Sequence, residues 1–135
     1  MINKKRKLKV LFLDILTDNK KLRREIEKTL YKGGTYSDHV QKVFGLGKDE
    51  WQTLYADKNK FSTRLPDIDA LIIGGSNQNP VKGKNTAWMK ETYKFIKRIV
   101  DCDIPVFGIC GGLQFVVKAM GGEVMYNPKG REFGT

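Results

Sequence analysis

Short apolar runs and amphipathic segments alternate along this chain. The apolar runs have the length of strands and are rich in leucine, isoleucine, valine and phenylalanine, which is typical of strands buried in a parallel sheet. One further segment, around Trp51, alternates its side chains with a period of two. The predicted strands cover residues 7–13, 51–55, 69–73, 104–109 and 123–126.

The segments between these runs have helical spacing. In the first, Leu22, Ile26 and Leu30 recur every four residues, and Thr17 or Asp18 can cap its N-terminus. Ser37 is the expected cap of a second helix, and Thr86 that of a third, whose apolar face carries Trp88, Phe95, Ile96, Ile99 and Val100. The predicted helices cover residues 19–31, 37–44, 86 to about 100, and 113–120.

Strands that alternate with helices predict the α/β class: a doubly wound, mostly parallel sheet with helices on both faces. In such sheets ligands bind beyond the carboxyl ends of the strands. Two glycine-rich segments fall at such ends, residues 74–76 and 108–112. We therefore expect function at these two junctions.

Composition fits a single domain over residues 1–135. Hydrophobic residues make up 40% of the chain, and the mean hydropathy is −0.44. No apolar run approaches the roughly 20 residues of a membrane helix. The basic N-terminus is followed by an apolar stretch that ends at Asp14 without a cleavage site, so no signal peptide is predicted and the expected location is the cytoplasm.

A net charge of +10 invites a nucleic-acid function, but the lysines are spread along the whole chain with no interleaved aromatic motif. A solvated, lysine-rich surface is the preferred interpretation, and a nucleic-acid partner is not expected. The chain has two cysteines and one histidine, and none has metal-ligand spacing.

The strongest chemical signal is G-x-C-x-G between a predicted strand and a predicted helix, at residues 108–112. This is the cysteine counterpart of the nucleophile elbow, a sharp turn that presents a reactive side chain. Gly108 and Gly112 would avoid a collision where strand and helix close on each other. Cys110 would lie at a helix N-terminus, which favours a thiolate, and the N–H of Gly111 would face a developing oxyanion. The alternative is a structural cysteine in a glycine-rich turn.

Residues 105–114, PVFGICGGLQ, resemble the nucleophile motif of class I glutamine amidotransferases, G-[IV]-C-x-G-x-Q. Residues 69–76, DALIIGGS, look like the strand and loop that supply that family's second oxyanion donor. Residues 119–124 and 127–135 are similar to the segment that follows the elbow. The resemblance is greatest to the glutaminase domain of GMP synthase and its stand-alone relatives.

The resemblance implies a flavodoxin-like fold and a glutaminase mechanism. Cys110 would attack the side-chain amide carbon of glutamine, and the released ammonia would pass to a synthetase domain or subunit. No cofactor or metal is implied for this step. The residues that it assigns are Gly111 and Gly75 as oxyanion donors, with Gly74 as second choice for the latter, and Gly74, Ser76 and Gln114 as substrate contacts.

The sequence departs from the family pattern in one respect. The family's histidine and glutamate form an H-x-E motif, which these 135 residues do not contain. His39, the one histidine, precedes the central strands and is expected on a helix surface. The domain is therefore expected to be C-terminally incomplete and, as given, inactive or weak. Two alternatives stay open: a γ-glutamyl peptide or amide hydrolase of the same superfamily, and a non-catalytic fragment.

Overall fold

The computed structural model describes residues 6–58 and 60–130, so the C-terminal residues 131–135 lie outside the described part. Within it, a four-stranded sheet has the order β2-β1-β3-β4, and each neighbouring pair is parallel. The predicted α/β class is confirmed. The strands are β1 (Val10–Asp14), β2 (Trp51–Tyr55), β3 (Ala70–Ile73) and β4 (Val106–Gly108).

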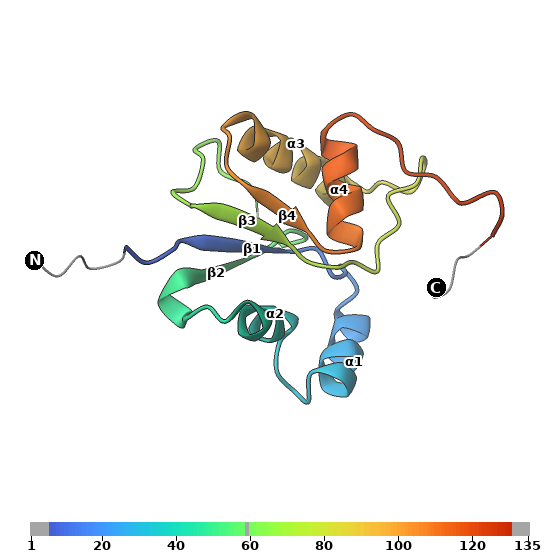
Figure 1. Cartoon of the computed structure of the whole chain (residues 1–135). Coiled ribbons are helices and arrows are strands. Elements are labelled where there is room, and N and C mark those ends of the chain that lie inside the picture. Colours follow the sequence, from blue (N-terminus) through green and yellow to red (C-terminus); the bar gives the residue numbers. More distant parts are fainter. Residues whose placement is uncertain (1–5, 59, 131–135) are drawn as a thin grey trace, which may run out of the picture.

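Helices cover both faces of this sheet (Figure 1). One face carries α3 (Ala87–Asp101) and α4 (Gly111–Ala119). The other carries α1 (Lys20–Leu30) and α2 (Tyr36–Phe44), and the short 3-10 helix η1 (Lys48–Glu50) leads into β2.

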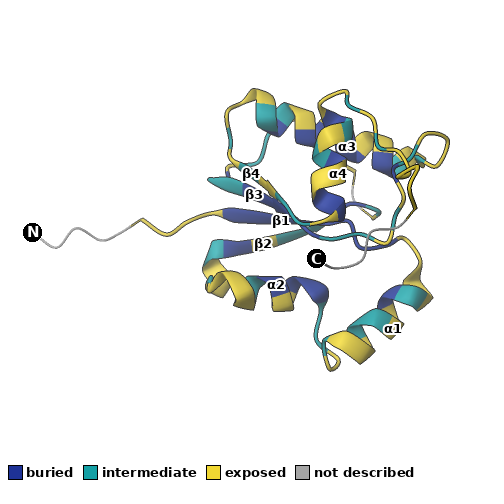
Figure 2. Ribbon diagram, turned by 45° about the vertical axis from the view of Figure 1, so that its right-hand side comes forward, coloured by how far each residue is buried: buried dark blue, intermediate teal, exposed yellow. Residues whose placement is uncertain are grey.

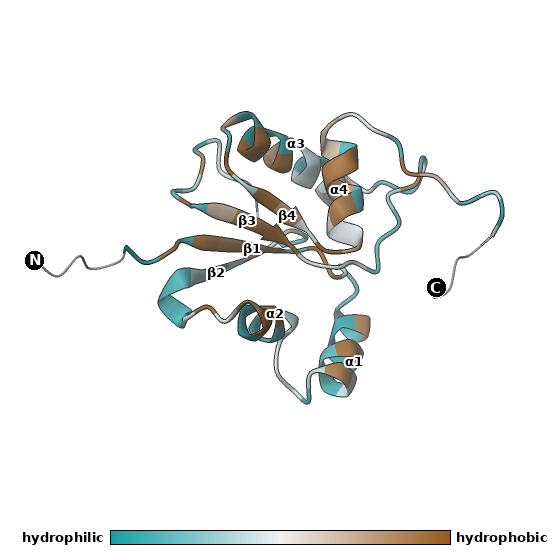
Figure 3. Cartoon of the chain, viewed as in Figure 1, coloured by the Kyte–Doolittle hydropathy of each residue, from teal (hydrophilic) through white to brown (hydrophobic). Residues whose placement is uncertain are grey.

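Two apolar cores form because successive strand residues face opposite sides of the sheet. Leu11 and Leu13 of β1 belong to the core under α3 and α4, whereas Val10 and Phe12 belong to the core above α2. Strand β1 is buried along its whole length in Figure 2 and β3 nearly so, and both are among the most hydrophobic segments in Figure 3. Burial on both faces explains why these two central strands are apolar runs, whereas β2 and β4, at the edges of the sheet, are only partly buried.

The first helix differs from its prediction. Leu30 is 65% exposed, and the residue that α1 buries is Arg23. Its guanidinium donates to both carboxylate oxygens of Asp14, at 2.9 and 2.8 Å, and Asp14 is fully buried at the end of β1. A buried carboxylate needs a cation, so the helix turns Arg23 toward the sheet.

Two predicted helix caps are also wrong. Asn19, rather than Thr17 or Asp18, caps α1 by accepting bonds from the backbone of Lys21 and Leu22. Thr35 caps α2 in a capping box with Asp38. Ser37, the expected cap of α2, instead accepts a hydrogen bond from the indole N–H of Trp51 inside the core.

The predicted strand at residues 123–126 is wrong as well. This segment is not a strand, and its Met125 and Tyr126 are 77% and 66% exposed. The Asn79 amide donates to the Tyr126 hydroxyl, and the Lys118 ammonium lies 3.9 Å from the Glu123 carboxylate. A strand exists only where a neighbour completes its hydrogen bonds, and no described strand pairs with this segment.

The Asp14–Arg23 pair can be tested by removing its cation. Arg23→Met should lower the free energy of unfolding by about 3 kcal/mol, because it leaves a buried carboxylate without its partner. Arg24→Met is the matched control: Arg24 is the exposed neighbour on the same helix, and its loss should change stability by less than about 0.5 kcal/mol. Urea denaturation measures both. Equal effects would show that Asp14 does not depend on Arg23.

Candidate active site

Two turns at the carboxyl end of the sheet form the candidate site. Strands β3 and β4 are neighbours, with Ile73 opposite Gly108, so the chain leaves both strands at the same edge. The turn after β3 holds residues 74–76, and the turn after β4 holds residues 109–111. The Ile109 N–H donates to the Ile73 carbonyl at 2.9 Å and ties the two turns together.

Cys110 stands at a sharp turn between β4 and α4. Its backbone has φ 50° and ψ −106°, a combination that side-chain-bearing residues rarely adopt and that costs roughly 1–3 kcal/mol. Its carbonyl accepts the N–H of Leu113 at 3.0 Å, the first helical turn of α4. The side chain is exposed. The turn thus presents a thiol to solvent at the start of a helix.

Glycines at the two predicted positions make this turn possible. A Cβ on Gly108 would lie 2.6 Å from the Leu113 nitrogen, and a Cβ on Gly112 would lie 2.4 Å from the Ile73 carbonyl oxygen. Both distances are shorter than real contacts allow, and the atoms they meet are backbone. The spacing G-x-C-x-G is therefore set by how closely strand, turn and helix approach.

Gly111 joins the elbow to the turn after β3. A Cβ there would lie 2.8 Å from the backbone nitrogen of Ser76, so the two turns are in direct contact. The N–H of Gly111 lies in the first turn of α4, where backbone donors have no partner within the helix. The Ser76 hydroxyl donates to the Ile15 carbonyl at 2.5 Å and accepts from the Gln78 N–H, which fixes its loop to the end of β1.

The two candidate glycines after β3 differ in what their N–H groups do. The N–H of Gly74 donates to the Leu13 carbonyl at 3.2 Å as part of the sheet. The N–H of Gly75 donates to the Tyr36 hydroxyl at 2.6 Å, so this donor points toward α2. No local sequence pattern predicts this bond, since Tyr36 lies 39 positions earlier. A backbone N–H group can donate to a ligand only if it is not paired with a neighbouring strand.

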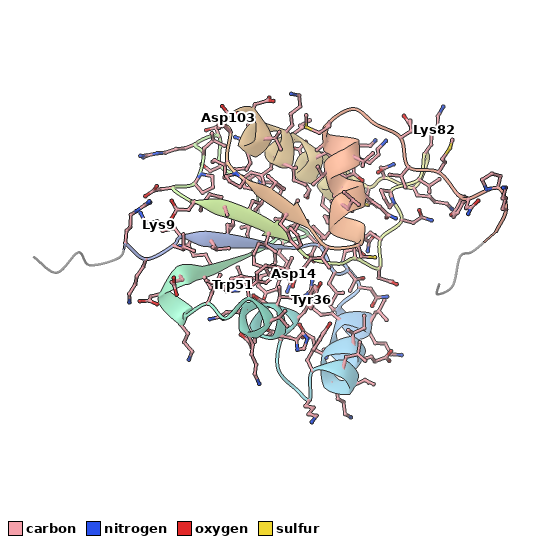
Figure 4. All side chains as sticks on the ribbon, viewed as in Figure 1. Lys9, Asp14, Tyr36, Trp51, Lys82 and Asp103 are labelled. Carbon is pink, nitrogen blue, oxygen red and sulfur yellow. The ribbon has the colours of Figure 1, made fainter. Side chains whose placement is uncertain are left out.

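Tyr36 is the residue that sequence reasoning missed. It is 7% exposed, and Figure 4 labels it beneath the sheet near Asp14. Burial raises the pKa of Tyr36 above its ordinary value, although the hydrogen bond from Gly75 acts in the opposite direction. The hydroxyl therefore keeps its proton at neutral pH.

The remaining predicted residues are less closely engaged. Gln114 is exposed on α4, one helical turn after Cys110. His39 is exposed on α2, which confirms its predicted place on a helix surface. Its ring contacts that of Tyr31. Cys102, the second cysteine, is exposed and is the C-cap residue of α3.

No described group of three or more histidine, cysteine or acidic side chains could hold a metal ion. Among the described helices, none is long and apolar enough to cross a membrane. The described residues bring a thiol, backbone N–H groups and one tyrosine hydroxyl to these two turns.

Comparisons with known proteins agree on a family. The family described as glutamine amidotransferase class-I matches residues 34–135. A glutamine amidotransferase-like protein of Schizosaccharomyces pombe is 29% identical over 76% of this chain and 46% of its own length. Gamma-glutamyl peptidase 4 of Arabidopsis thaliana is 27% identical over 80% of this chain and 42% of its own.

A more similar but shorter match is the glutamine-hydrolysing GMP synthase of Helicobacter pylori, 40% identical over 60% of this chain and 15% of its own length. A crystal structure of a glutamine amidotransferase from Methylobacillus flagellatus covers 91% of this chain and 43% of its own, with a TM-score of 0.59 and 21% identity, and so supports the fold. The chain belongs to the class I glutamine amidotransferase family. It spans less than half the length of these relatives.

The elbow can be tested through Gly112. Gly112→Ala should lower the free energy of unfolding by about 2–3 kcal/mol, because the new Cβ meets the Ile73 carbonyl. Helix propensity alone predicts the opposite sign, a gain of up to about 1 kcal/mol. Gly47→Ala is the control, since its Cβ meets only side-chain ends and should cost less than about 0.5 kcal/mol. A neutral or stabilising Gly112→Ala in chemical denaturation would contradict this packing.

Proposed function

We propose that this chain carries the nucleophile of a glutamine amidotransferase that hydrolyses glutamine and delivers ammonia to a synthetase. The observation that carries the proposal is the backbone of Cys110, a strained turn that three close backbone approaches hold in place. Strain of this kind persists where the surrounding structure over-determines it, and it gathers at functional sites. The family supplies the reaction.

In the proposed reaction the Cys110 sulfur attacks the side-chain amide carbon of glutamine. The carbonyl oxygen becomes an oxyanion, for which the N–H groups of Gly111 and Gly75 are the proposed donors. Ammonia leaves when the C–N bond breaks, and a γ-glutamyl thioester remains on Cys110. Water then releases glutamate and restores the thiol.

Departing ammonia takes up a proton, and a positioned acid would supply it roughly 10²- to 10⁴-fold faster than solvent. His39 is unsuited to this role, because it is exposed on α2 and its ring contacts that of Tyr31. We therefore assign to this chain the nucleophile and the oxyanion donors, with Ser76 and Gln114 as proposed substrate contacts through the backbone and the side chain respectively.

Hydrolysis of γ-glutamyl peptides or amides is a second candidate, because one relative that covers 80% of this chain is a gamma-glutamyl peptidase. Both reactions begin with the same attack on a γ-glutamyl carbonyl and differ in the leaving group. The acceptor is proposed to be a synthetase because other relatives are a GMP synthase and a pyridoxal 5'-phosphate synthase subunit.

Substrate preference separates the two candidates. We expect the full-length gene product to have a higher kcat/KM for glutamine than for a γ-glutamyl dipeptide, measured as release of glutamate. The reverse order would favour the peptidase. Cys110→Ala should abolish either activity, by roughly 10⁴-fold or more.

Cys102, which is exposed like Cys110, is an internal control for the reactivity of Cys110. A chloromethyl ketone analogue of glutamine should label Cys110 at least about 100-fold faster than Cys102, because only Cys110 has donors for the oxyanion that forms on the way. Iodoacetamide, which alkylates thiols without such an intermediate, should discriminate much less. Peptide mass spectrometry gives both rates. Equal labelling of both cysteines by the ketone would count against the proposal.

A further inference from the structure

The N–H of Gly75 already has a partner in this structure. It donates to the Tyr36 hydroxyl at 2.6 Å, a short bond for an N–H group. A backbone N–H has one hydrogen and makes one well-aligned bond. While Tyr36 holds it, the N–H of Gly75 cannot also make a strong bond to a second oxygen.

Tyr36 is held in this position from several sides. Its ring packs edge-on against Phe12, with ring centroids 5.6 Å apart, and stacks on Tyr31 at 5.5 Å. Its backbone N–H donates to the Glu27 carboxylate at 3.2 Å. It is also the first residue of α2, directly after the Thr35 cap. These contacts and its burial hold the ring of Tyr36 in place.

The peptide of Gly75 is the more adaptable side of this bond. Gly75 has no side chain and is only half-buried, whereas its neighbours are fixed, because Gly74 donates to the Leu13 carbonyl and the Ser76 hydroxyl donates to the Ile15 carbonyl. Space is tight at Gly74, where a Cβ would lie 2.7 Å from the Phe12 ring and 2.8 Å from the Tyr36 ring. A change of hydrogen bond at Gly75 therefore needs only a local rotation of its peptide, while the rest of the turn stays against the ring of Tyr36.

We propose that Tyr36 is a positioning residue that holds the Gly75 N–H away from the oxyanion until substrate takes this donor from the hydroxyl. The inference rests on the proposed function, because it takes Gly75 as an oxyanion donor. It assigns to Tyr36 a role in the basal reaction: the bond to its hydroxyl must be broken in each attack by Cys110. Removing the hydroxyl should leave the N–H free and make the attack easier.

The test compares two electrophiles in the full-length gene product. The Cys110 thiolate adds to the carbonyl carbon of the chloromethyl ketone analogue of glutamine and forms an oxyanion. Sulfur then moves to the methylene carbon and expels chloride, its bond to the carbonyl carbon breaks, and the C=O bond forms again. Iodoacetamide forms its S–C bond and expels iodide in one displacement, with no oxyanion. The ratio of the two rate constants therefore reports the oxyanion donors and is insensitive to changes in thiol exposure.

Tyr36→Phe should raise this ratio about threefold to tenfold, the factor expected when one competing hydrogen bond is removed. Tyr31→Phe is the matched control, since it removes a hydroxyl from the neighbouring ring and leaves the Gly75 bond in place; its ratio should match the wild type. Thermal unfolding of both variants checks that the fold is retained.

A second measurement reads the bond directly. The amide proton of Gly75 should exchange faster with solvent in Tyr36→Phe than in the wild type, followed by NMR, and should be unchanged in Tyr31→Phe. An unchanged exchange rate in Tyr36→Phe would overturn the inference, and so would a ketone ratio that stays level. A ketone ratio that falls would also overturn it and would make the hydroxyl itself a donor to the oxyanion.

The outcomes also separate the inference from the proposed function. If the wild type prefers the ketone over iodoacetamide and Tyr36→Phe does not change the ratio, the nucleophile assignment stands and the role of Tyr36 is wrong. If the wild-type protein has no preference for the ketone, the proposed function is wrong, and so is the role proposed for Tyr36.

Discussion

The close approach of strand β3, strand β4 and helix α4 is the constraint on which the site depends. At Gly112 the helix comes so near to the Ile73 carbonyl that no side chain fits, and at Gly108 the strand is as close to the helix. This packing forces Cys110 into its strained backbone conformation and leaves its thiol exposed. The same packing presses Gly111 onto Ser76, so the turns after the two strands become one site.

The opposite face of the sheet supports that site from below. Asp14 ends β1 inside the protein, where Arg23 neutralises it and orients α1. Glu27 lies one turn further along α1, and its carboxylate accepts a hydrogen bond from the backbone N–H of Tyr36. This bond connects α1 to the start of α2. Tyr36 in turn reaches Gly75. A chain of contacts thus runs from a buried charge to a backbone donor of the proposed oxyanion site.

The fold could be predicted from sequence where its causes are local. The central strands β1 and β3 were found because burial on both faces demands short apolar runs. The elbow was found because its steric limits act over five consecutive residues, 108–112. Errors arose where a distant partner decides the outcome. Arg23 is buried because of Asp14, Ser37 faces Trp51, and residues 123–126 are no strand without a neighbour. The Tyr36–Gly75 bond could not be predicted for the same reason, since it joins residues 39 positions apart and no local sequence pattern indicates it.

The central claim is that Cys110 bonds covalently to the γ-glutamyl group. Its most direct test is to mix the full-length gene product with glutamine, quench with acid within the first turnover, and measure the mass of each cysteine peptide. The account predicts a γ-glutamyl thioester on the Cys110 peptide that hydroxylamine removes and that Cys110→Ser lacks. Glutamine hydrolysis without any glutamyl group on Cys110, or with the group on Cys102, would contradict it.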